Sequence, residues 1–179
     1  MTKATVILVM GVAGSGKTTI GQKLAQALGW SFHDADEFHP AANIAKMSAG
    51  IPLDDRDRAP WLAAMRACID ACLARGESSV VACSALRERY RAILLDGTDR
   101  VQGVFLHGDY PLLLRRISQR QGHFMKENML RSQFEALEPP RHVLTLDAAL
   151  PPDEIVSRIC QTLKLTPAET GSAGVPPAI

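Results

Sequence analysis

The stretch that decides the fold is Gly11-Val-Ala-Gly-Ser-Gly-Lys-Thr18, which satisfies the pattern G-x-x-x-x-G-K-[ST] in full. It follows the apolar run Thr5–Met10 and opens a helical pattern over Gly16–Leu28, which is the strand–loop–helix context that a phosphate-binding loop needs. The glycines free the backbone to curl around an anion, so that successive N–H groups and the helix N-terminus point at it. The motif therefore predicts a nucleoside triphosphate site.

Each residue of this loop has an expected part in binding the triphosphate. The Lys17 ammonium can reach the β- and γ-phosphates, so Lys17 is predicted to be catalytic, and the Thr18 hydroxyl can bind Mg²⁺. A glycine-rich turn with a chance lysine is the alternative, which the flanking strand and helix disfavour. The predicted ATP-binding residues of this segment are Gly11, Val12, Ala13, Gly14, Ser15, Gly16, Lys17, Thr18 and Thr19.

Outside the loop, strand and helix patterns alternate, which predicts the α/β class with right-handed βαβ units. Further strands are expected over Ser31–His33, Ser78–Cys83, Val101–His107 and His142–Asp147. Helices are expected from Pro60 to Gly76, behind a capping Ser84, from Asp109 and Pro111 onward, and over Pro151–Leu163. The prediction is a three-layer fold of the P-loop NTPase type, with about five parallel strands, helices on both faces and a helical lid.

Length and composition narrow the class of protein. The 179 residues suffice for one domain, placed at residues 1–165, and the segment 166–179 is expected to be a flexible tail. A formal net charge of +1 argues against a dedicated nucleic-acid or anionic-membrane binder. No apolar stretch reaches 18 residues and no signal peptide is recognisable, so no membrane partner and a cytoplasmic location are expected.

The four cysteines, Cys68, Cys72, Cys83 and Cys160, have no spacing typical of a metal site. Cys68 and Cys72 are four residues apart and share a helix face. We expect all four to be free and mostly buried thiols of a reducing compartment.

Two carboxylates stand out because the usual magnesium ligand is missing. Many P-loop ATPases carry an Asp at the end of a core strand, but Ser78–Cys83 is followed by Ser84-Ala85-Leu86. Asp34 and Asp36 follow the second strand at i and i+2, where an extended chain places both on one face. One, assigned to Asp34, can orient the metal, and Asp36 can accept the proton of an attacking hydroxyl. A solvated acidic turn is the alternative.

The segment Arg115–Arg131 holds five basic residues and one acidic residue in a chain that is otherwise balanced. Arg116 and Arg120 are spaced i, i+4 and project together, and Gly122 offers a hinge. The pattern favours a lid over residues 115–138 that brings arginines to the transferring phosphoryl group, although a solvated helix face is the alternative.

Four blocks of sequence together carry a resemblance to a known family. GVAGSGKTT, DADEFHP with NIAKMSAGIPLDDRDRAPWL, VVACSALRERYR, and RQGHFMKENMLRSQFEALEPP resemble in order the blocks of bacterial-type gluconokinases, which are similar in build to shikimate kinase. The resemblance implies phosphorylation of the 6-hydroxyl of D-gluconate, with ATP and Mg²⁺ as cofactors, by an enzyme that is commonly a homodimer. The chain departs from the family at Ala35 (usually Gly), Arg87 (usually Lys) and His107 (usually Lys).

The resemblance also assigns residues. Asp36 and His39 match the second Asp and the His of the family's Asp-Gly-Asp-x-x-His-Pro block, which implies that they bind substrate near the acceptor hydroxyl. Arg116 and Arg120 match lid arginines near the nucleotide, and Arg120 is predicted to be catalytic. His123, in the GHF block, is expected to bind substrate.

The gluconate carboxylate needs a cation, and Arg58, Arg87 and Arg91 are the candidates. Arg58 is preferred because it starts a helix beside the cleft within the substrate-side segment 41–76, although it could instead pair with Asp54 or Asp55. Either Asp36 or His39 could act as the base, and His39 could simply cap its turn.

Two other functions are compatible with a phosphate-binding loop. The first is a shikimate-like or other small-metabolite kinase, which the blocks DRDRAPWL and CSALRERYR disfavour. The second is a non-catalytic nucleotide-binding module, which would need neither Asp36 nor the lid arginines. Acceptor-dependent release of ADP distinguishes these alternatives.

Overall fold

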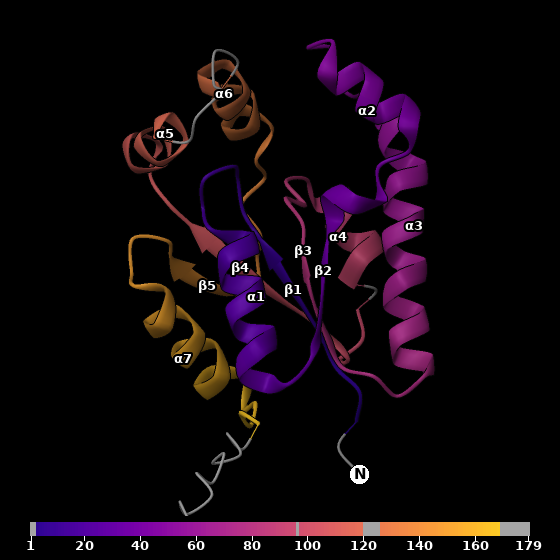
Figure 1. The fold of residues 1–179 in the computed structure, drawn as a ribbon, viewed down its shortest axis with the longest axis vertical. Coiled ribbons are helices and arrows are strands. Elements are labelled where there is room, and N and C mark those ends of the chain that lie inside the picture. The colour runs from indigo at the N-terminus through magenta and orange to yellow at the C-terminus, as the bar shows by residue number, and fades with distance from the viewer. Residues whose placement is uncertain (1–2, 96, 120–125, 169–179) are drawn as a thin grey trace, which may run out of the picture.

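The computed structural model describes residues 3–95, 97–119 and 126–168. Five strands form one parallel sheet in the order β2-β3-β1-β4-β5 (Figure 1). The strands are β1 (Val6–Met10), β2 (Ser31–Asp34), β3 (Ser79–Ala82), β4 (Val101–His107) and β5 (Leu144–Asp147). This sheet confirms the predicted α/β fold.

Helices cover both faces of the sheet, and the central strand shows why. They are α1 (Lys17–Leu28) and α7 (Pro152–Leu163) on one face and α3 (Asp55–Ala74) and α4 (Glu88–Leu95) on the other. Successive side chains of a strand point to opposite faces. Ile7 and Val9 therefore pack with α1 and α7, whereas Leu8 packs with α3 and α4. Every residue of β1 is buried, as its unbroken apolar pattern predicts.

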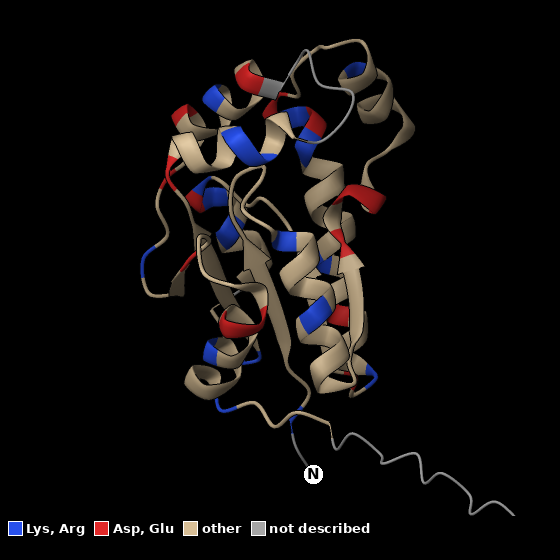
Figure 2. Ribbon diagram, turned by 60° about the vertical axis from the view of Figure 1, so that its left-hand side comes forward, with Lys and Arg blue, Asp and Glu red and all other residues tan. Residues whose placement is uncertain are grey.

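Because all strands run the same way, the loops that follow them meet at one edge of the sheet. At this edge α5 (Tyr110–Ser118) and α6 (Lys126–Ala136) lie on one side and α2 (Ala41–Ser48) lies on the other (Figure 1). Buried Leu113, Ile117 and Leu130 pack α5 and α6 against Val12 of the phosphate-binding loop. Figure 2 shows Lys and Arg on these overhanging helices.

Two helix starts differ from the prediction. Helix α3 begins at Asp55 rather than at Pro60, because Asp54 and Asp57 form a capping box in which each carboxylate accepts the other's backbone N–H. Helix α4 begins at Glu88, and its first N–H donates to the Glu138 carboxylate at 2.6 Å instead of being capped by Ser84. The start of α5 is as predicted, with the Asp109 side chain as its N-cap.

The C-terminal segment, the cysteines and the helix lengths bear on the remaining predictions from the sequence. The predicted tail begins in contact with the domain, because the Ala168 N–H donates to the Ala27 carbonyl at 2.9 Å. The rest of the tail and the predicted hinge at Gly122 lie outside the described residues. The four cysteines are free, as expected. Among the described helices, none combines the length and the apolar character needed to cross a membrane.

Candidate active site

The phosphate-binding loop connects β1 to α1 and leaves the start of α1 open. The helix N-cap is Gly16, which has φ 95° and provides no side-chain hydrogen bond, and the first turn contains no acidic residue. Gly14 also has positive φ, and a Cβ there would lie 2.9 Å from Ile117 Cγ1. The loop therefore needs glycine to approach α5, and the N–H groups that begin α1 have no capping side chain. This geometry fits a phosphate group bound at the start of α1.

Thr18 and Asp34, predicted as metal ligands, are brought together by the pairing of β2 beside β3. The Thr18 hydroxyl donates to Asp34 Oδ2 at 2.9 Å, and Asp34 Oδ1 accepts the Asp36 N–H at 3.1 Å. Hydroxyl and carboxylate oxygens are the donors that Mg²⁺ prefers, so this pair fits the ion. Asp34, at the end of the neighbouring edge strand, is therefore the candidate for the acid that is missing after β3.

Asp36 does not share an extended face with Asp34, which corrects the sequence prediction. Residues Ala35–Phe38 form a 3₁₀ turn whose N-cap is Asp34. The turn is fixed from α3, where Trp61 Nε1 donates to the Ala35 carbonyl at 2.7 Å. Asp36 is exposed on this turn. The hydrogen bonds made by Asp34 and Ala35 hold it at the edge of the sheet. The alternation of side chains along a strand does not determine its position.

Charged groups of the phosphate-binding loop and of residues 34–36 lie near Cys83, the residue that follows β3. Burial raises the pKa of the Cys83 thiol to about 12; Lys17 opposes the shift, while Asp36 and Asp34 add to it. Coulombic effects of this kind require that the three charged groups lie near the thiol. Lys17 also donates from Nζ to the Val12 carbonyl at 3.1 Å. The predicted catalytic lysine and both carboxylates therefore lie close enough to Cys83 to affect its pKa.

His39 lies against Trp61, and its protonation is set by its neighbours. The two rings stack with centroids 4.5 Å apart and planes 6° from parallel. Burial lowers the pKa of His39, with Asp36 opposing this shift and Arg58 reinforcing it. Asn43 Nδ2 donates to the Asp57 carbonyl at 2.8 Å and lies 3.4 Å from His39 Nδ1. Because that amide nitrogen is a donor, Nδ1 must accept, which leaves the proton of the neutral ring on Nε2.

A basic cluster lies beside this histidine, at the start of α3 and α4. Tyr90 donates from its hydroxyl to Asp55 at 2.6 Å and receives a bond from Arg58 at 3.5 Å. The Arg58 and Arg89 guanidinium groups lie over the Tyr90 ring, 5.8 and 5.4 Å from its centroid. The Tyr90 hydrogen bond, followed by Arg89, Arg87 and Arg58, lowers the pKa of Asp55. Three cations thus surround one carboxylate, which leaves positive charge for an anionic substrate.

Asp54 and Asp55, the alternative partners of Arg58, have other contacts. The Asp54 carboxylate caps α3, and Asp55 forms an ion pair with Arg89 at 2.5 Å. Arg58 is instead oriented by Tyr90, whose ring and hydroxyl it contacts. The Arg58 guanidinium also acts on His39, whose pKa it helps to lower.

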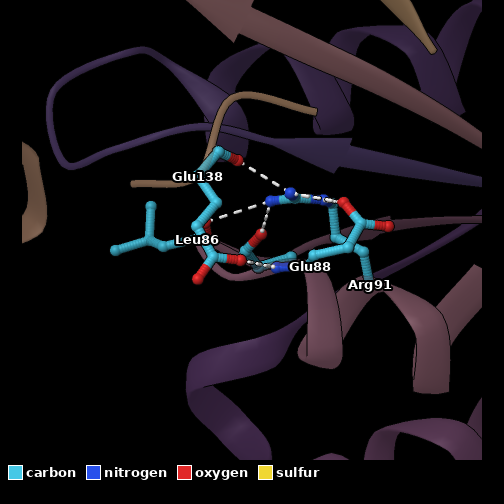
Figure 3. Close-up of polar contacts among 5 residues, drawn as sticks. Leu86, Glu88, Arg91 and Glu138 are labelled. Atoms are coloured by element: carbon cyan, nitrogen blue, oxygen red, sulfur yellow. Dashed lines mark hydrogen bonds and ion pairs between the residues drawn. The ribbon is translucent and has the colours of Figure 1, made fainter. Parts of the chain in front are cut away.

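Arg91, the third candidate for binding the substrate carboxylate, does not belong to this cluster. That prediction is wrong. Its side chain is 2% exposed and all five of its N–H groups have protein acceptors (Figure 3). These acceptors are the Ala85, Leu86 and Glu138 carbonyls, at 2.9, 3.0 and 2.7 Å, and the Glu88 carboxylate. Arg91 therefore joins the loop after β3 to the segment that follows α6.

Replacing Arg91 with Met is expected to lower the free energy of unfolding by about 2–4 kcal/mol, because it leaves buried carbonyl groups without donors. The melting temperature should fall by on the order of 10 °C. Arg158→Met is the matched control, since Arg158 forms an exposed i, i+4 pair with Glu154 that contributes little. Thermal denaturation of both variants checks this, and equal melting temperatures would contradict it.

A cavity of about 330 Å³ continues from the phosphate-binding loop toward α5 and the loop after β5. Arg116, which is predicted to bind the nucleotide, lines it. The sequence reasoning missed the others, although their place after the last strand of a parallel sheet was a signal for some of them. They are Ile20, Gln119, Ala148, Leu150, Pro152 and Ile155. Arg120 and His123 lie outside the described residues.

Gln133 of α6 was also missed. Its side-chain oxygen accepts the Ala13 N–H of the phosphate-binding loop at 2.7 Å, so the lid region contacts the loop directly. No spacing in the sequence connects two residues that are 120 positions apart.

Fold and site together define a protein of the P-loop kinase class. The sequence model of the shikimate kinase family matches residues 13–164. The chain is 48% identical over 134 residues to the thermosensitive gluconokinase of Escherichia coli K12, covering 75% of this chain and 72% of that protein. The chain belongs to the gluconokinase family within this class.

Solved structures agree with this assignment. A gluconokinase from Sinorhizobium meliloti 1021 superposes with a TM-score of 0.80 at 43% identity, covering 92% of this chain and 94% of that one. A sugar kinase from Janibacter sp. HTCC2649 gives a TM-score of 0.84 at 39% identity, covering 91% and 96%.

Proposed function

We propose that this protein transfers the γ-phosphoryl group of ATP to the 6-hydroxyl of D-gluconate, giving 6-phosphogluconate and ADP. The observation that carries the proposal is the basic cluster of Arg58, Arg87 and Arg89 around Asp55, whose member Arg58 also acts on His39. Such a cluster suits a carboxylate-bearing acceptor. The similarity to gluconokinases supports the choice among such acids.

On the nucleotide side, the open start of α1 and Lys17 bind the triphosphate, and Arg116 lines the cavity for the rest of the nucleotide. Thr18 and Asp34 would hold Mg²⁺, which supplies charge neutralisation at the phosphates when bound. Arg120 and the lid over residues 115–138 would complete the charge around the transferring group and exclude water.

On the acceptor side, Asp36 accepts the proton of the attacking hydroxyl. His39 is the weaker candidate for the base, because its Nδ1 already accepts from Asn43 and its Nε2 carries the proton. His39 therefore donates to a substrate hydroxyl through Nε2. The transition state of phosphoryl transfer is loose, so orientation and charge stabilisation account for most of the rate.

The substrate carboxylate is bound by Arg58, with Arg87 as the second cation. Tyr90 orients Arg58 by accepting its hydrogen bond, and Asp55 orients Tyr90 by accepting a hydrogen bond from the Tyr90 hydroxyl. Binding the carboxylate at this end leaves the far end of a six-carbon chain to reach Asp36. The homodimer that the family resemblance implies and the cytoplasmic location expected from the sequence stay predictions.

The direct test is ADP release from ATP with a panel of acceptors: gluconate, other aldonic acids, shikimate and glucose. We expect release that depends on gluconate and a phosphorylated product at its 6-position by NMR. Glucose, which lacks the carboxylate, should give no more ADP than the acceptor-free control. Turnover with shikimate but not with gluconate would overturn the proposal, as would ADP release that no acceptor increases.

Arg58→Lys is expected to raise the KM for gluconate by about 10–100-fold, because a single ammonium replaces a bidentate, pre-oriented guanidinium. The KM for ATP should stay within about twofold of the parent. Arg56→Lys, on the same helix and exposed, is the matched control. Steady-state kinetics in both substrates measures this, and an unchanged KM for gluconate would assign the carboxylate to another cation.

A further inference from the structure

Three side chains of the kinds that bind transition metals meet on the face of the sheet covered by α3. His33 lies on the edge strand β2, and Cys68 and Cys72 lie one turn apart on α3. Cys72 Sγ is 3.8 Å from His33 Nε2, and the ligand atoms of all three residues lie within 4.8 Å of one another. None of the three takes part in the proposed phosphoryl transfer.

The spacing suits a small tetrahedral cation. Zinc binds thiolate sulfur at about 2.3 Å and imidazole nitrogen at about 2.0–2.1 Å, so tetrahedral angles place these two atoms about 3.6 Å apart. The observed separation of 3.8 Å is close to this value. Cys72 is buried, whereas Cys68 and His33 are half-buried, so a water molecule can reach the fourth position.

Charges around the cluster are compatible with a divalent cation. Two thiolates, formed by releasing their protons to water, neutralise Zn²⁺. Arg75 Nη2 lies 3.7 Å from Cys72 Sγ, where it can donate to a metal-bound thiolate, and its own charge is balanced by Glu77 at 2.7 Å.

We infer that His33, Cys68 and Cys72 form a binding site for Zn²⁺ that joins β2 to α3. Occupation fixes β2, which ends at Asp34, against the helix that carries Arg58 and Trp61. Because the ligands come from two elements that separate on unfolding, bound metal stabilises the native state by mass action.

The test uses Co²⁺ as a spectroscopic probe on the full, reduced chain with excess Mg²⁺ present to occupy oxygen-donor sites. We expect one equivalent of Co²⁺ to give sulfur-to-cobalt charge-transfer absorption and the visible bands of tetrahedral coordination, both abolished by Zn²⁺. Zn²⁺ alone should raise the melting temperature of the parent protein.

His33→Gln and Cys68→Ser are the diagnostic variants, and Cys160→Ser, a cysteine on α7, is the control. Each diagnostic variant should weaken Co²⁺ binding by more than the roughly 10–100-fold that loss of an outer-sphere partner costs, and should lose the thermal shift. The control should keep both signals. Absence of the tetrahedral bands in the parent, or their persistence in Cys68→Ser and His33→Gln, would overturn the proposal.

Discussion

Replacing Asp36 with Asn is expected to lower kcat by about 10²–10⁴-fold, the range that general-base catalysis contributes. The amide cannot accept the proton of the attacking hydroxyl at neutral pH, but its shape and its hydrogen bonds to a bound sugar are similar. The KM for gluconate should therefore change by less than about tenfold. The Ala35–Phe38 turn should persist, because it depends on Asp34 and Trp61 rather than on the Asp36 side chain.

Glu37→Gln is the control for this experiment, since Glu37 is exposed on the same turn. It removes the same charge from the next position, so any general effect of lost negative charge appears in it too. A kcat of the parent's magnitude in Asp36→Asn, with only KM altered, would assign Asp36 to binding and return His39 to consideration as the base.

Replacing Lys17 with Met is expected to lower kcat by at least about 10²–10³-fold, by analogy with removal of a single charge-stabilising donor from other active sites. Methionine retains most of the length of the side chain and its packing while removing the ammonium. Circular dichroism and thermal denaturation should show that the fold is retained.

Lys23→Met is the matched control, because Lys23 lies on the same helix in an exposed ion pair with Asp153. Its kcat and KM for ATP should equal those of the parent within error. Full activity in Lys17→Met would contradict the assignment of residues 11–18 as the catalytic phosphate-binding loop.

The layered fold follows from sequence patterns that are local. The run at Val6–Met10 is apolar throughout because β1 is covered on both faces, and the helices carry stripes at helical spacing. Helix starts were harder to place. The proline at 60 suggested the beginning of α3, but an acidic capping box six residues earlier sets it. The cap of α4 comes from Glu138, which no local pattern connects to Glu88.

Candidate site residues were predictable where a motif states their chemistry. Lys17 and Thr18 come from such a motif, and the expected proximity of Thr18 and Asp34 is present as a hydrogen bond. Arg58 was preferred to Arg91 in the sequence because it starts a helix beside the cleft, but no pattern excluded Arg91 as a partner of the substrate carboxylate. Its burial and the hydrogen bonds of all five of its N–H groups to protein acceptors exclude it.

Long-range groupings were the least predictable. His33 is 35 positions from Cys68, and the pairing of β2 with β3 is what brings it under α3. The cysteine spacing alone indicated free thiols, and the histidine is what makes the cluster a candidate metal site. The same reasoning applies to Gln133 and Ala13, which meet only because α6 folds over the loop.

The bonds around Arg91 have a consequence for protein engineering. The Glu138 N–H donates to the Leu86 carbonyl, and Glu138 accepts hydrogen bonds from the Glu88 N–H and from Arg91. These bonds join the end of the predicted lid segment to the loop after β3 and the start of α4 as one structural unit. A chimera that takes its lid from another kinase should therefore have its crossover point before Glu138. A crossover placed beyond it would exchange one half of this unit without the other, and such recombinants should express poorly even when their nucleotide sites are intact.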